Sequence, residues 1–205
     1  MPDSVLRDKG GWLSPVIRRV EQEGRPAVLK DYRSKSFFAR NFFGPYLVRR
    51  EYAILKRLEG MPGVPRAYRI VEGRAILLEY IEGRTSGKFK PGELPPGVFD
   101  ALRETVREIH RRGVVHLDLR QKKNILITAD FRPCVIDFGA ALMPSPASPL
   151  RLLLPKLRRV DEMAVLKFKQ RAFPDLLTEA ERKALARHRF WRRFWIFTPR
   201  GKYVR

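Results

Sequence analysis

The 205-residue sequence is poor in cysteine, in acidic residues and in long apolar runs. Cys134 is the only cysteine, so no disulfide can form within the chain, which is typical of a reducing compartment. No run approaches the roughly 20 apolar residues that a membrane-spanning helix needs. The first residues lack the apolar core of a secretory signal. These absences argue against a disulfide scaffold and a transmembrane protein, and they predict a cytoplasmic protein.

Acidic residues number 22 against 43 lysines and arginines, which gives a formal net charge of +21. A field of this size attracts polyanions such as nucleic acid, anionic lipid or phosphorylated substrates. A generally basic, solvated surface is the alternative interpretation. Apolar residues make up 44% of the chain, enough for a sizeable core in one moderate domain or in a small lobe joined to a larger one.

Apolar periodicity in the first half predicts strands around one helix. We expect a hairpin at 11–32, a loop or short helix at 33–46 and a helix at 46–59. A turn-rich link at 61–70 and a strand at 74–83 would follow. In the helix, Glu51 shares the apolar face with Leu47, Leu55 and Leu58. A lone carboxylate on that face is costly, so we expect Glu51 to be paired.

The second half is expected to be mainly helical, with short strands. We expect a linker rich in glycine and proline at 84–97. Helices are expected at 98–112, 160–168 and 178–197, and short β segments at 114–119, 124–128 and 134–138. Gly113 stands where a helix C-terminal cap belongs, and Thr178 with Glu181 forms a capping-box pattern.

Polar residues gather in two phrases of this half, "VVHLDLRQKKNILI" at 114–127 and "CVIDFG" at 134–139. Asp118, Asn124 and Asp137 lie beside or at the end of short apolar runs in these phrases. Carboxylate and amide oxygens are ligands that Mg²⁺ accepts readily. The pattern therefore raises the hypothesis of one site formed by the three side chains.

Taken in order with "AVLK", which ends at Lys30, and with "LLEYI", these phrases resemble the protein-kinase-like fold over about residues 10–170. The resemblance implies an α+β, bilobal protein. A β-rich, nucleotide-binding lobe at 1–82 would join a reduced, helical catalytic lobe at 83–205, with a minimal activation segment. ATP and Mg²⁺ would bind between the lobes.

The resemblance also implies a role for each matching residue. Asp118 would act as the catalytic base, and Asn124 and Asp137 would hold the metal. Lys30 would hold the α- and β-phosphates, and Glu51 would position Lys30, which explains a carboxylate on an apolar helix face.

Further positions are expected to bind the nucleotide or support the site. The carbonyl of Glu79 and the backbone of Ile81 would meet the adenine, and Gly10 and Gly11 would approach the phosphates. His116 is expected to be structural. Asp161 has two interpretations, a buried aspartate that supports the catalytic loop or a helix N-cap.

The sequence departs from the kinase pattern in four ways, and the last three resemble atypical bacterial kinases of the RIO-like and lipopolysaccharide-kinase-like group. The glycine loop is degraded to "KGGWLSPVIRRV", and Asn124 follows Asp118 by six positions instead of five. The extra residue gives Gln121 or Lys123 a chance to displace Asn124 from the cation. Leu117 replaces the usual arginine, and the activation segment is only about 20 residues long.

The resulting hypothesis is transfer of the ATP γ-phosphoryl group to a hydroxyl acceptor, either a protein serine or threonine, or a lipopolysaccharide-core sugar or other small molecule. The alternative is a catalytically weak pseudokinase that acts as a scaffold or nucleotide sensor, which the degraded glycine loop favours. The net charge favours an anionic acceptor.

The segment 186–205 contains six arginines, one lysine and six aromatic residues. This composition suits a helix in the interface of an anionic membrane, which would place the protein peripherally on the inner membrane face. Packing of the aromatic residues on the C-terminal lobe is an equal alternative. Binding of nucleic acid is a third interpretation that no motif supports.

Overall fold

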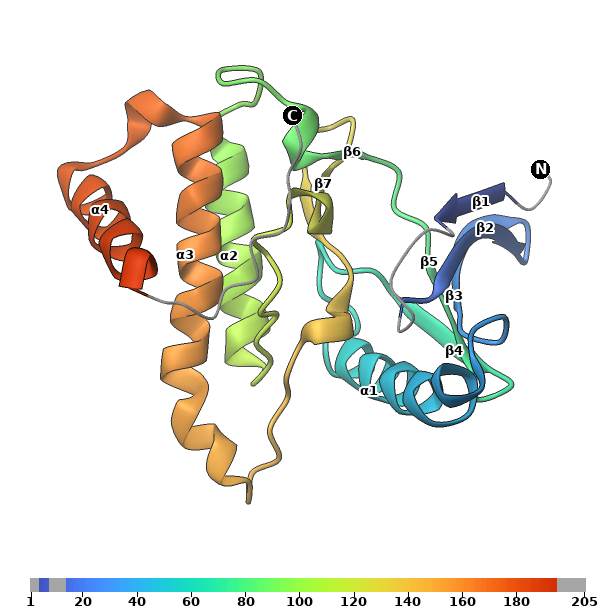
Figure 1. Cartoon of the computed structure of the whole chain (residues 1–205). Helices are drawn as coiled ribbons and strands as arrows, with labels where there is room; N and C mark the ends of the chain where they lie inside the picture. Colours follow the sequence, from blue (N-terminus) through green and yellow to red (C-terminus); the bar gives the residue numbers. More distant parts are fainter. Residues whose placement is uncertain (1–3, 8–13, 195–205) are drawn as a thin grey trace.

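The computed structural model describes residues 4–7 and 14–194 of the chain. Its first part is a five-stranded antiparallel sheet in the order β1-β2-β3-β5-β4, with one helix, α1, against it (Figure 1). The elements are β1 (Ser4–Arg7), β2 (Val16–Gln22), β3 (Arg25–Asp31), α1 (Gly44–Arg57), β4 (Ala67–Val71) and β5 (Ala75–Glu79). Strands β1 and β4 were not predicted.

Two tight hairpins build most of this sheet. Strands β2 and β3 are joined by the two residues Glu23 and Gly24, and strands β4 and β5 by the three residues Glu72, Gly73 and Arg74. Glu23, Gly24, Glu72 and Gly73 have positive φ, between 48° and 75°, a conformation that hairpin turns favour because it matches the right-handed twist of the paired strands. The expected turn-rich link at 61–70 is therefore wrong for its second half. The recurring Glu-Gly pair was the sequence signal for this hairpin.

A π-helical turn, η1 (Ala39–Phe43), leads into α1. Its backbone bonds reach one residue further than in an α-helix, and the amide of Gly44 donates to the carbonyl of Ala39. Pro45 follows in the first turn of α1, where a missing amide removes no hydrogen bond within the helix. Gly44 is also required by packing, because a Cβ at this position would lie 2.7 Å from the Cβ of Tyr32.

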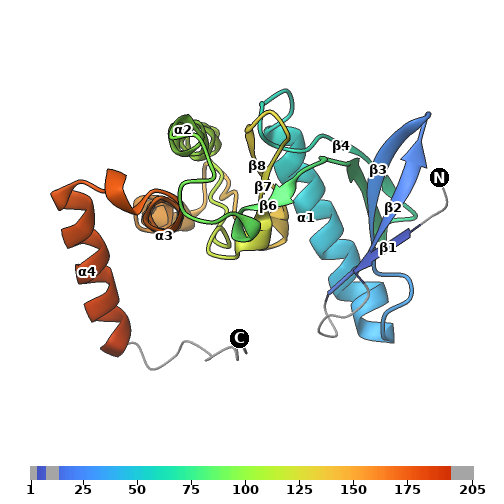
Figure 2. The ribbon, with the colours of Figure 1, turned by 90° about the horizontal axis from the view of Figure 1, so that it is seen from above.

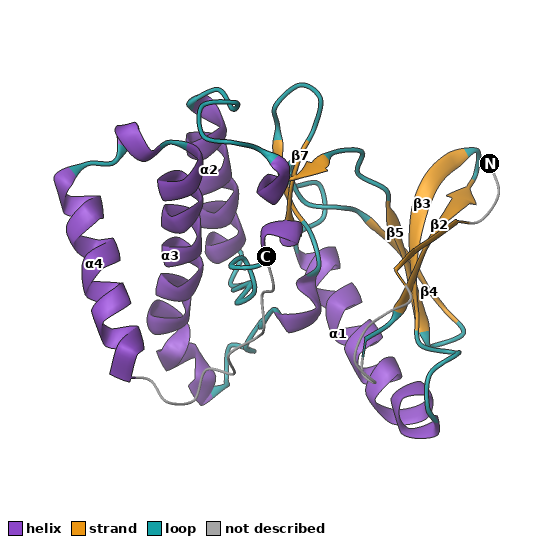
Figure 3. Cartoon of the chain, turned by 45° about the horizontal axis from the view of Figure 1, so that its top comes forward, coloured by secondary structure: helices purple, strands orange, loops and turns teal. Residues whose placement is uncertain are grey.

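The second part contains long helices and a small sheet in the order β6-β7-β8 (Figures 1 and 2). The elements are β6 (Arg84–Thr85), α2 (Gly97–Arg111), β7 (Ile125–Ile127), β8 (Pro133–Val135), α3 (Leu154–Ala172) and α4 (Glu179–Phe194), with short 3-10 turns η2 (Ser86–Lys88), η3 (Lys122–Asn124), η4 (Phe138–Ala140), η5 (Pro149–Leu153) and η6 (Pro174–Leu176). Figure 3 shows helices α2, α3 and α4 on one side of the molecule, and α1 with strands β2, β3, β4 and β5 on the other.

Several boundaries differ from the predictions. The expected strand at 114–119 makes only an isolated bridge between Val115 and Leu142. Helix α3 begins at Leu154 because Pro155 can stand in a first helical turn without cost. The capping box at the start of α4 is present: Glu181 N donates to Thr178 Oγ1 at 3.2 Å, and Thr178 N donates to Glu181 Oε2 at 2.8 Å.

One apolar core runs through both parts of the molecule. Side chains of α1 and β5 share it with side chains of α2, α3 and the β7–β8 hairpin, and Phe138 lies fully buried near its centre. The core fixes the end of β8 against α1 and the loop after α2, which carry the polar phrases. Among the described residues, no helix has both the length and the apolar character needed to cross a membrane.

Candidate active site

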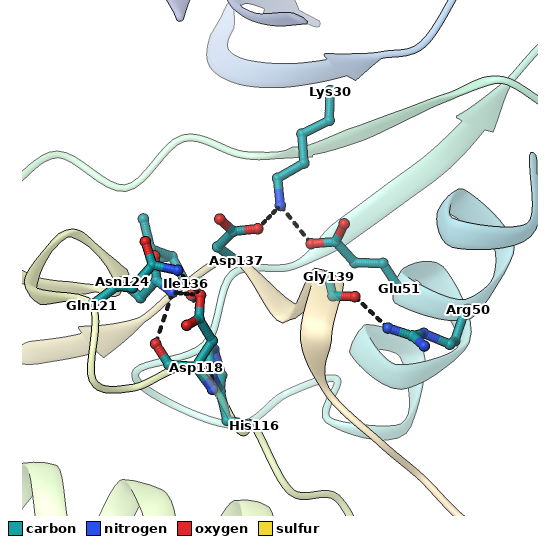
Figure 4. Close-up of polar contacts among 10 residues, drawn as sticks. All are labelled: Lys30, Arg50, Glu51, His116, Asp118, Gln121, Asn124, Ile136, Asp137 and Gly139. Atoms are coloured by element: carbon teal, nitrogen blue, oxygen red, sulfur yellow. Dashed lines mark hydrogen bonds and ion pairs between the residues drawn. The ribbon is translucent and has the colours of Figure 1, made fainter. Parts of the chain in front are cut away.

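Lys30 and Glu51 form a buried ion pair between the sheet and the helix. Lys30 lies on β3, between β2 and β5, and Glu51 lies on the inward face of α1. Each residue is 6% exposed, and Lys30 Nζ lies 2.6 Å from Glu51 Oε1 (Figure 4). The pairing expected for Glu51 is thus present, and it accounts for a carboxylate on an apolar helix face.

Asp137 is the second partner of this lysine. Lys30 Nζ lies 2.9 Å from Asp137 Oδ1, although 107 positions separate the two residues. Burial alone would lower the pKa of Lys30, but the charges of Glu51 and Asp137 outweigh it and raise that pKa above its usual value. The ammonium group of Lys30 therefore stays charged between the two carboxylates.

The backbone conformation of Asp137 directs its side chain toward Lys30. The residue follows β8 and adopts the left-handed region, with φ 68° and ψ 68°, a conformation that aspartate tolerates better than most side chains. Non-glycine residues in this region concentrate at ligand sites, where surrounding packing maintains them. Here Phe138, fully buried, anchors the next position, and the Asp137 side chain remains 28% exposed.

Asp118 lies opposite this cluster and is held by two amides. Asn124 Nδ2 donates to Asp118 Oδ2 at 2.9 Å and to its carbonyl oxygen at 3.0 Å, and Gln121 Nε2 donates to the same Oδ2 (Figure 4). Both amides thus use one carboxylate oxygen. Within the described chain, Oδ1 makes no hydrogen bond and is the atom left for a ligand.

The extra residue between Asp118 and Asn124 is absorbed by the short turn η3. The amide of Asn124 donates to the carbonyl of Gln121 at 2.9 Å, which brings Asn124 inside at 1% exposure. Lys122 and Lys123 point outward and are exposed. Lys123 therefore does not take the buried position of Asn124, and Gln121 joins Asn124 on Asp118.

A fully buried carboxylate supports this loop from α3. Asp161 accepts hydrogen bonds from His116 N at 2.7 Å, from Leu117 N at 2.8 Å and from His110 Nε2 at 3.0 Å. The interpretation as a helix N-cap is wrong, because Asp161 lies in the middle of α3. The supporting interpretation is confirmed. Leu117 needs this support, since its φ of 65° is unfavourable for a branched side chain.

His116 connects the loop of Asp118 with the chain before Asp137. Its Nε2 lies 3.1 Å from the carbonyl oxygen of Ile136, and its Nδ1 accepts from Asp118 N at 3.3 Å. These contacts need a neutral ring protonated at Nε2. Burial lowers the pKa of His116, which maintains that form. The expected structural role agrees with this geometry.

Of the four positions expected to contact the nucleotide through the backbone, the structure describes Glu79 and Ile81. Glu79 ends β5, where its backbone N donates to Arg66 O and its side chain accepts from Arg66 N. Ile81 follows, half-buried. Both line a hollow of about 830 Å³ that opens beside the α1–β4 loop and does not include Lys30, Asp118 or Asp137. Gly10 and Gly11 lie outside the described residues.

Two residues of the site were missed in the sequence. Gln121, on Asp118, was considered only as a competitor for the metal. Arg50 precedes Glu51 on α1 and donates through Nη2 to the carbonyl of Gly139, so that α1 also binds the segment after Asp137 (Figure 4). A polar residue next to Glu51 was the only sequence signal for Arg50.

The donor set fits a magnesium ion. Asp137 offers a partly exposed carboxylate, and Asn124, with its amide nitrogen turned to Asp118, offers its side-chain oxygen. Mg²⁺ is usually held by one or two protein oxygens together with water and substrate phosphates. Within residues 4–7 and 14–194, no group of three or more histidine, cysteine, aspartate or glutamate side chains forms a denser metal site.

Comparison with known proteins gives one family. The model of the RIO domain matches residues 28–180, about three quarters of the chain. Among curated proteins, serine/threonine-protein kinase cds1 of Schizosaccharomyces pombe is 35% identical over 105 residues. Serine/threonine-protein kinase D of Synechocystis is 33% identical over 67 residues. These matches cover 46% and 32% of the chain but only 22% and 13% of the relatives' own lengths.

The fold is similar to solved structures of Rio2 kinase from Chaetomium thermophilum. A complex with ADP/Mg²⁺ and phosphoaspartate superimposes with a TM-score of 0.63 at 17% identity, over 91% of this chain and 61% of that one. A second Rio2 structure gives 0.59 at 18% identity, over 88% and 70%. The expected α+β, protein-kinase-like fold is confirmed.

Proposed function

This chain belongs to the RIO domain family of atypical, protein-kinase-like proteins, and on that premise we propose that it is an ATP-dependent kinase. The observation that best supports the proposal is the convergence of Lys30, Glu51 and Asp137 across 107 positions of the sequence. The site would lie between two lobes, at 1–82 and 83–205. ATP and Mg²⁺ are the cofactors that this donor set and the Rio2 complex with ADP/Mg²⁺ favour.

In the proposed reaction, Lys30 binds the α- and β-phosphates, and Glu51 holds the lysine in place. Asp137 and Asn124 hold Mg²⁺, which supplies positive charge to the phosphates during transfer. Asp118 orients the acceptor hydroxyl and takes its proton at Oδ1, because Oδ2 is already bound by Gln121 and Asn124. The resemblance to kinases also assigns the adenine to backbone atoms of Glu79 and Ile81 and the phosphates to Gly10 and Gly11, and these assignments stay predictions.

The surroundings of Asp118 favour an anionic acceptor. Arg120, Lys122 and Lys123 are exposed next to Asp118, and the chain has a net charge of +21. The activation segment is short, which favours a lipopolysaccharide-core sugar or another small molecule over a peptide held along an extended loop. A protein serine or threonine is the other acceptor class. The basic segment 186–205 would then bring the enzyme to an anionic membrane.

Phosphotransfer by the purified full chain tests the proposal. Labelled ATP and Mg²⁺ are supplied with a cell extract, and label is traced into protein, lipid and small-molecule fractions. We expect transfer by the wild type, loss of transfer in Asp118→Ala and Asp137→Ala, and no loss in Asp175→Ala, which removes an exposed aspartate from η6. Equal behaviour of all four proteins contradicts the catalytic role and favours the pseudokinase alternative.

The Rio2 complex favours a second candidate, because it contains phosphoaspartate. In that case an aspartate of the chain itself would accept the phosphoryl group, and water would release it. Label on the chain that hydroxylamine removes, and that Asp137→Ala or Asp118→Ala abolishes, would support this function. Label that is stable to hydroxylamine and found only on other molecules would exclude it.

A further inference from the structure

The most exposed group of aromatic side chains in the described structure lies at the start of α1. Phe37, Phe38, Phe42 and Tyr46 are 61%, 64%, 60% and 61% exposed. We call these four residues the aromatic patch. Burial of one phenylalanine side chain is favourable by about 1.5–3 kcal/mol, so an exposed group of this size is a feature that a folded chain avoids unless it binds something.

The patch is a consequence of helix geometry and not of unfolded chain. Phe38, Phe42 and Tyr46 follow one another at intervals of four residues on the outer side, while Ala39, Gly44 and Val48 face the core. The rings also touch one another. The centroid of Phe37 lies 5.7 Å from that of Phe38 and 6.2 Å from that of Phe42, and Phe38 and Phe42 are 6.1 Å apart.

The charge around the patch has one sign. The segment 33–50 contains four arginines and one lysine and no acidic residue. Arg40 lies between the phenylalanines and is exposed, and Arg49 is exposed one turn beyond Tyr46. Basic side chains beside exposed aromatic rings complement an anionic surface that also offers an apolar layer.

We propose that the aromatic patch inserts into the interface of an anionic lipid bilayer. The start of α1 lies below the five-stranded sheet, at the end of the helix that is remote from α2, α3 and α4 (Figure 1). A protruding helix end enters a deformable headgroup layer, where aromatic rings reach the acyl boundary and arginines stay among the phosphates. One acidic-lipid contact contributes about 1 kcal/mol per basic residue near the surface, which adds to the apolar term.

This proposal is independent of the segment 186–205 and of phosphotransfer. It rests on described residues only, and it adds an interaction surface to the sheet-bearing part of the molecule. It also has a consequence for the site, since the same helix presents Glu51 to Lys30 at its next turn after Tyr46. Docking through the patch would fix the orientation of α1, and with it the cleft, relative to the bilayer.

Co-sedimentation of the full chain with vesicles is the first test. Vesicles of phosphatidylcholine alone are compared with vesicles that also contain phosphatidylglycerol. We expect the wild type to bind the anionic vesicles, and the variant Phe37→Ser/Phe38→Ser/Phe42→Ser to bind them at least about tenfold more weakly. Phe131→Ser is the matched control, because Phe131 is 44% exposed on the β7–β8 turn, far from the patch in sequence. Equal binding by all three proteins overturns the proposal.

A position-specific probe separates the patch from the C-terminal segment. Cys134 is buried, so an environment-sensitive fluorophore can be attached to a cysteine introduced as Phe38→Cys or, in the control, as Phe131→Cys. Anionic vesicles should shift the emission to the blue at position 38 and leave position 131 unchanged. No shift at position 38, or light scattering that shows the patch mediating a dimer without lipid, overturns the proposal.

Discussion

Two aspartates of this protein, Asp161 and Asp137, lie on either side of the same loop and differ in what surrounds them. Asp161 is 0% exposed and accepts three hydrogen bonds from the chain around His116. Asp137 keeps 28% of its side chain exposed and meets the charged Lys30. The first carboxylate is fully buried and bonded within the protein, whereas the second is partly exposed beside a cation.

This difference in burial indicates a structural role for Asp161 and a role in ligand binding for Asp137. A buried carboxylate that receives backbone amides stabilises one conformation of a loop, and nothing else can reach it. A partly exposed carboxylate beside a cation is placed to bind a metal and phosphates. We therefore expect changes at Asp161 to affect mainly folding, and changes at Asp137 to affect mainly activity.

The largest expected effect is at Asp161. The substitution Asp161→Ala leaves two backbone amides and His110 buried without an acceptor, so the free energy of unfolding should fall by about 3–5 kcal/mol. Asp161→Asn, which retains one acceptor oxygen, should lose less. Urea denaturation followed by circular dichroism measures both. A loss of under about 1 kcal/mol for Asp161→Ala would show that the hydrogen bonds to this residue contribute little.

Asp137→Asn should have the opposite profile. The side chain is nearly isosteric and Lys30 keeps Glu51, so the free energy of unfolding should change by less than about 1 kcal/mol. Phosphotransfer should fall by about 10²–10³-fold, because the charge that holds the cation is lost. Steady-state kinetics with ATP provide the measurement. A stable variant with full activity would refute the assignment of Asp137.

Glu51→Gln tests whether the ion pair acts on the cleft or only on the fold. Lys30 keeps Asp137 as a partner but loses the charge that fixes it on the α1 side, so we expect roughly a tenfold loss in kcat/KM for ATP, equivalent to about 1.4 kcal/mol. Glu59→Gln is the control, since it removes a carboxylate that pairs with Lys56 on the surface. Equal kinetics for the two variants would leave no functional role for Glu51.

The smallest expected effect is a pH dependence at His116. Burial lowers the pKa of the folded histidine below 6.5, so the unfolded chain binds the proton more readily. Stability should therefore be highest above pH 6.5 and fall as the pH decreases below it, by up to about 1.4 kcal/mol per pH unit. His116→Asn, which keeps an acceptor for Asp118 N, should lose this part of the dependence. Thermal unfolding from pH 7.5 to 5.5 measures the difference.

The predicted partner of Glu51 shows what pattern reasoning achieves. An acidic residue on an apolar helix face demanded a buried cation, and Lys30 is there at 2.6 Å. Asp161 shows where the reasoning fails. The two interpretations of that residue differed only in where the helix begins, and the first turn of α3, with Pro155, could not be separated from the proline-rich stretch before it.

Strand β4 and the contacts of Gln121 and Arg50 were missed for a related reason. The segment of β4 is only five residues long and has no clear polar alternation, and only its pairing with β5 defines it as a strand. Gln121 and Arg50 are ordinary polar residues in sequence. They matter because Gln121 bonds to Asp118 across a short turn, and because the fold brings the carbonyl of Gly139, 89 positions away in sequence, to Arg50.

The sequence by itself determined the division into a strand-rich first half and a mainly helical second half, the polar phrases at Asp118 and Asp137, and the need for a cation beside Glu51. These follow from local propensity, from periodicity and from the cost of burying an unpaired charge. The tertiary structure decided which aspartate is fully buried and which stays partly exposed, because that depends on packing between segments far apart in the chain. It also decided that the phenylalanines before α1 face outward, since only the π turn at Gly44 sets which side of the helix meets the core.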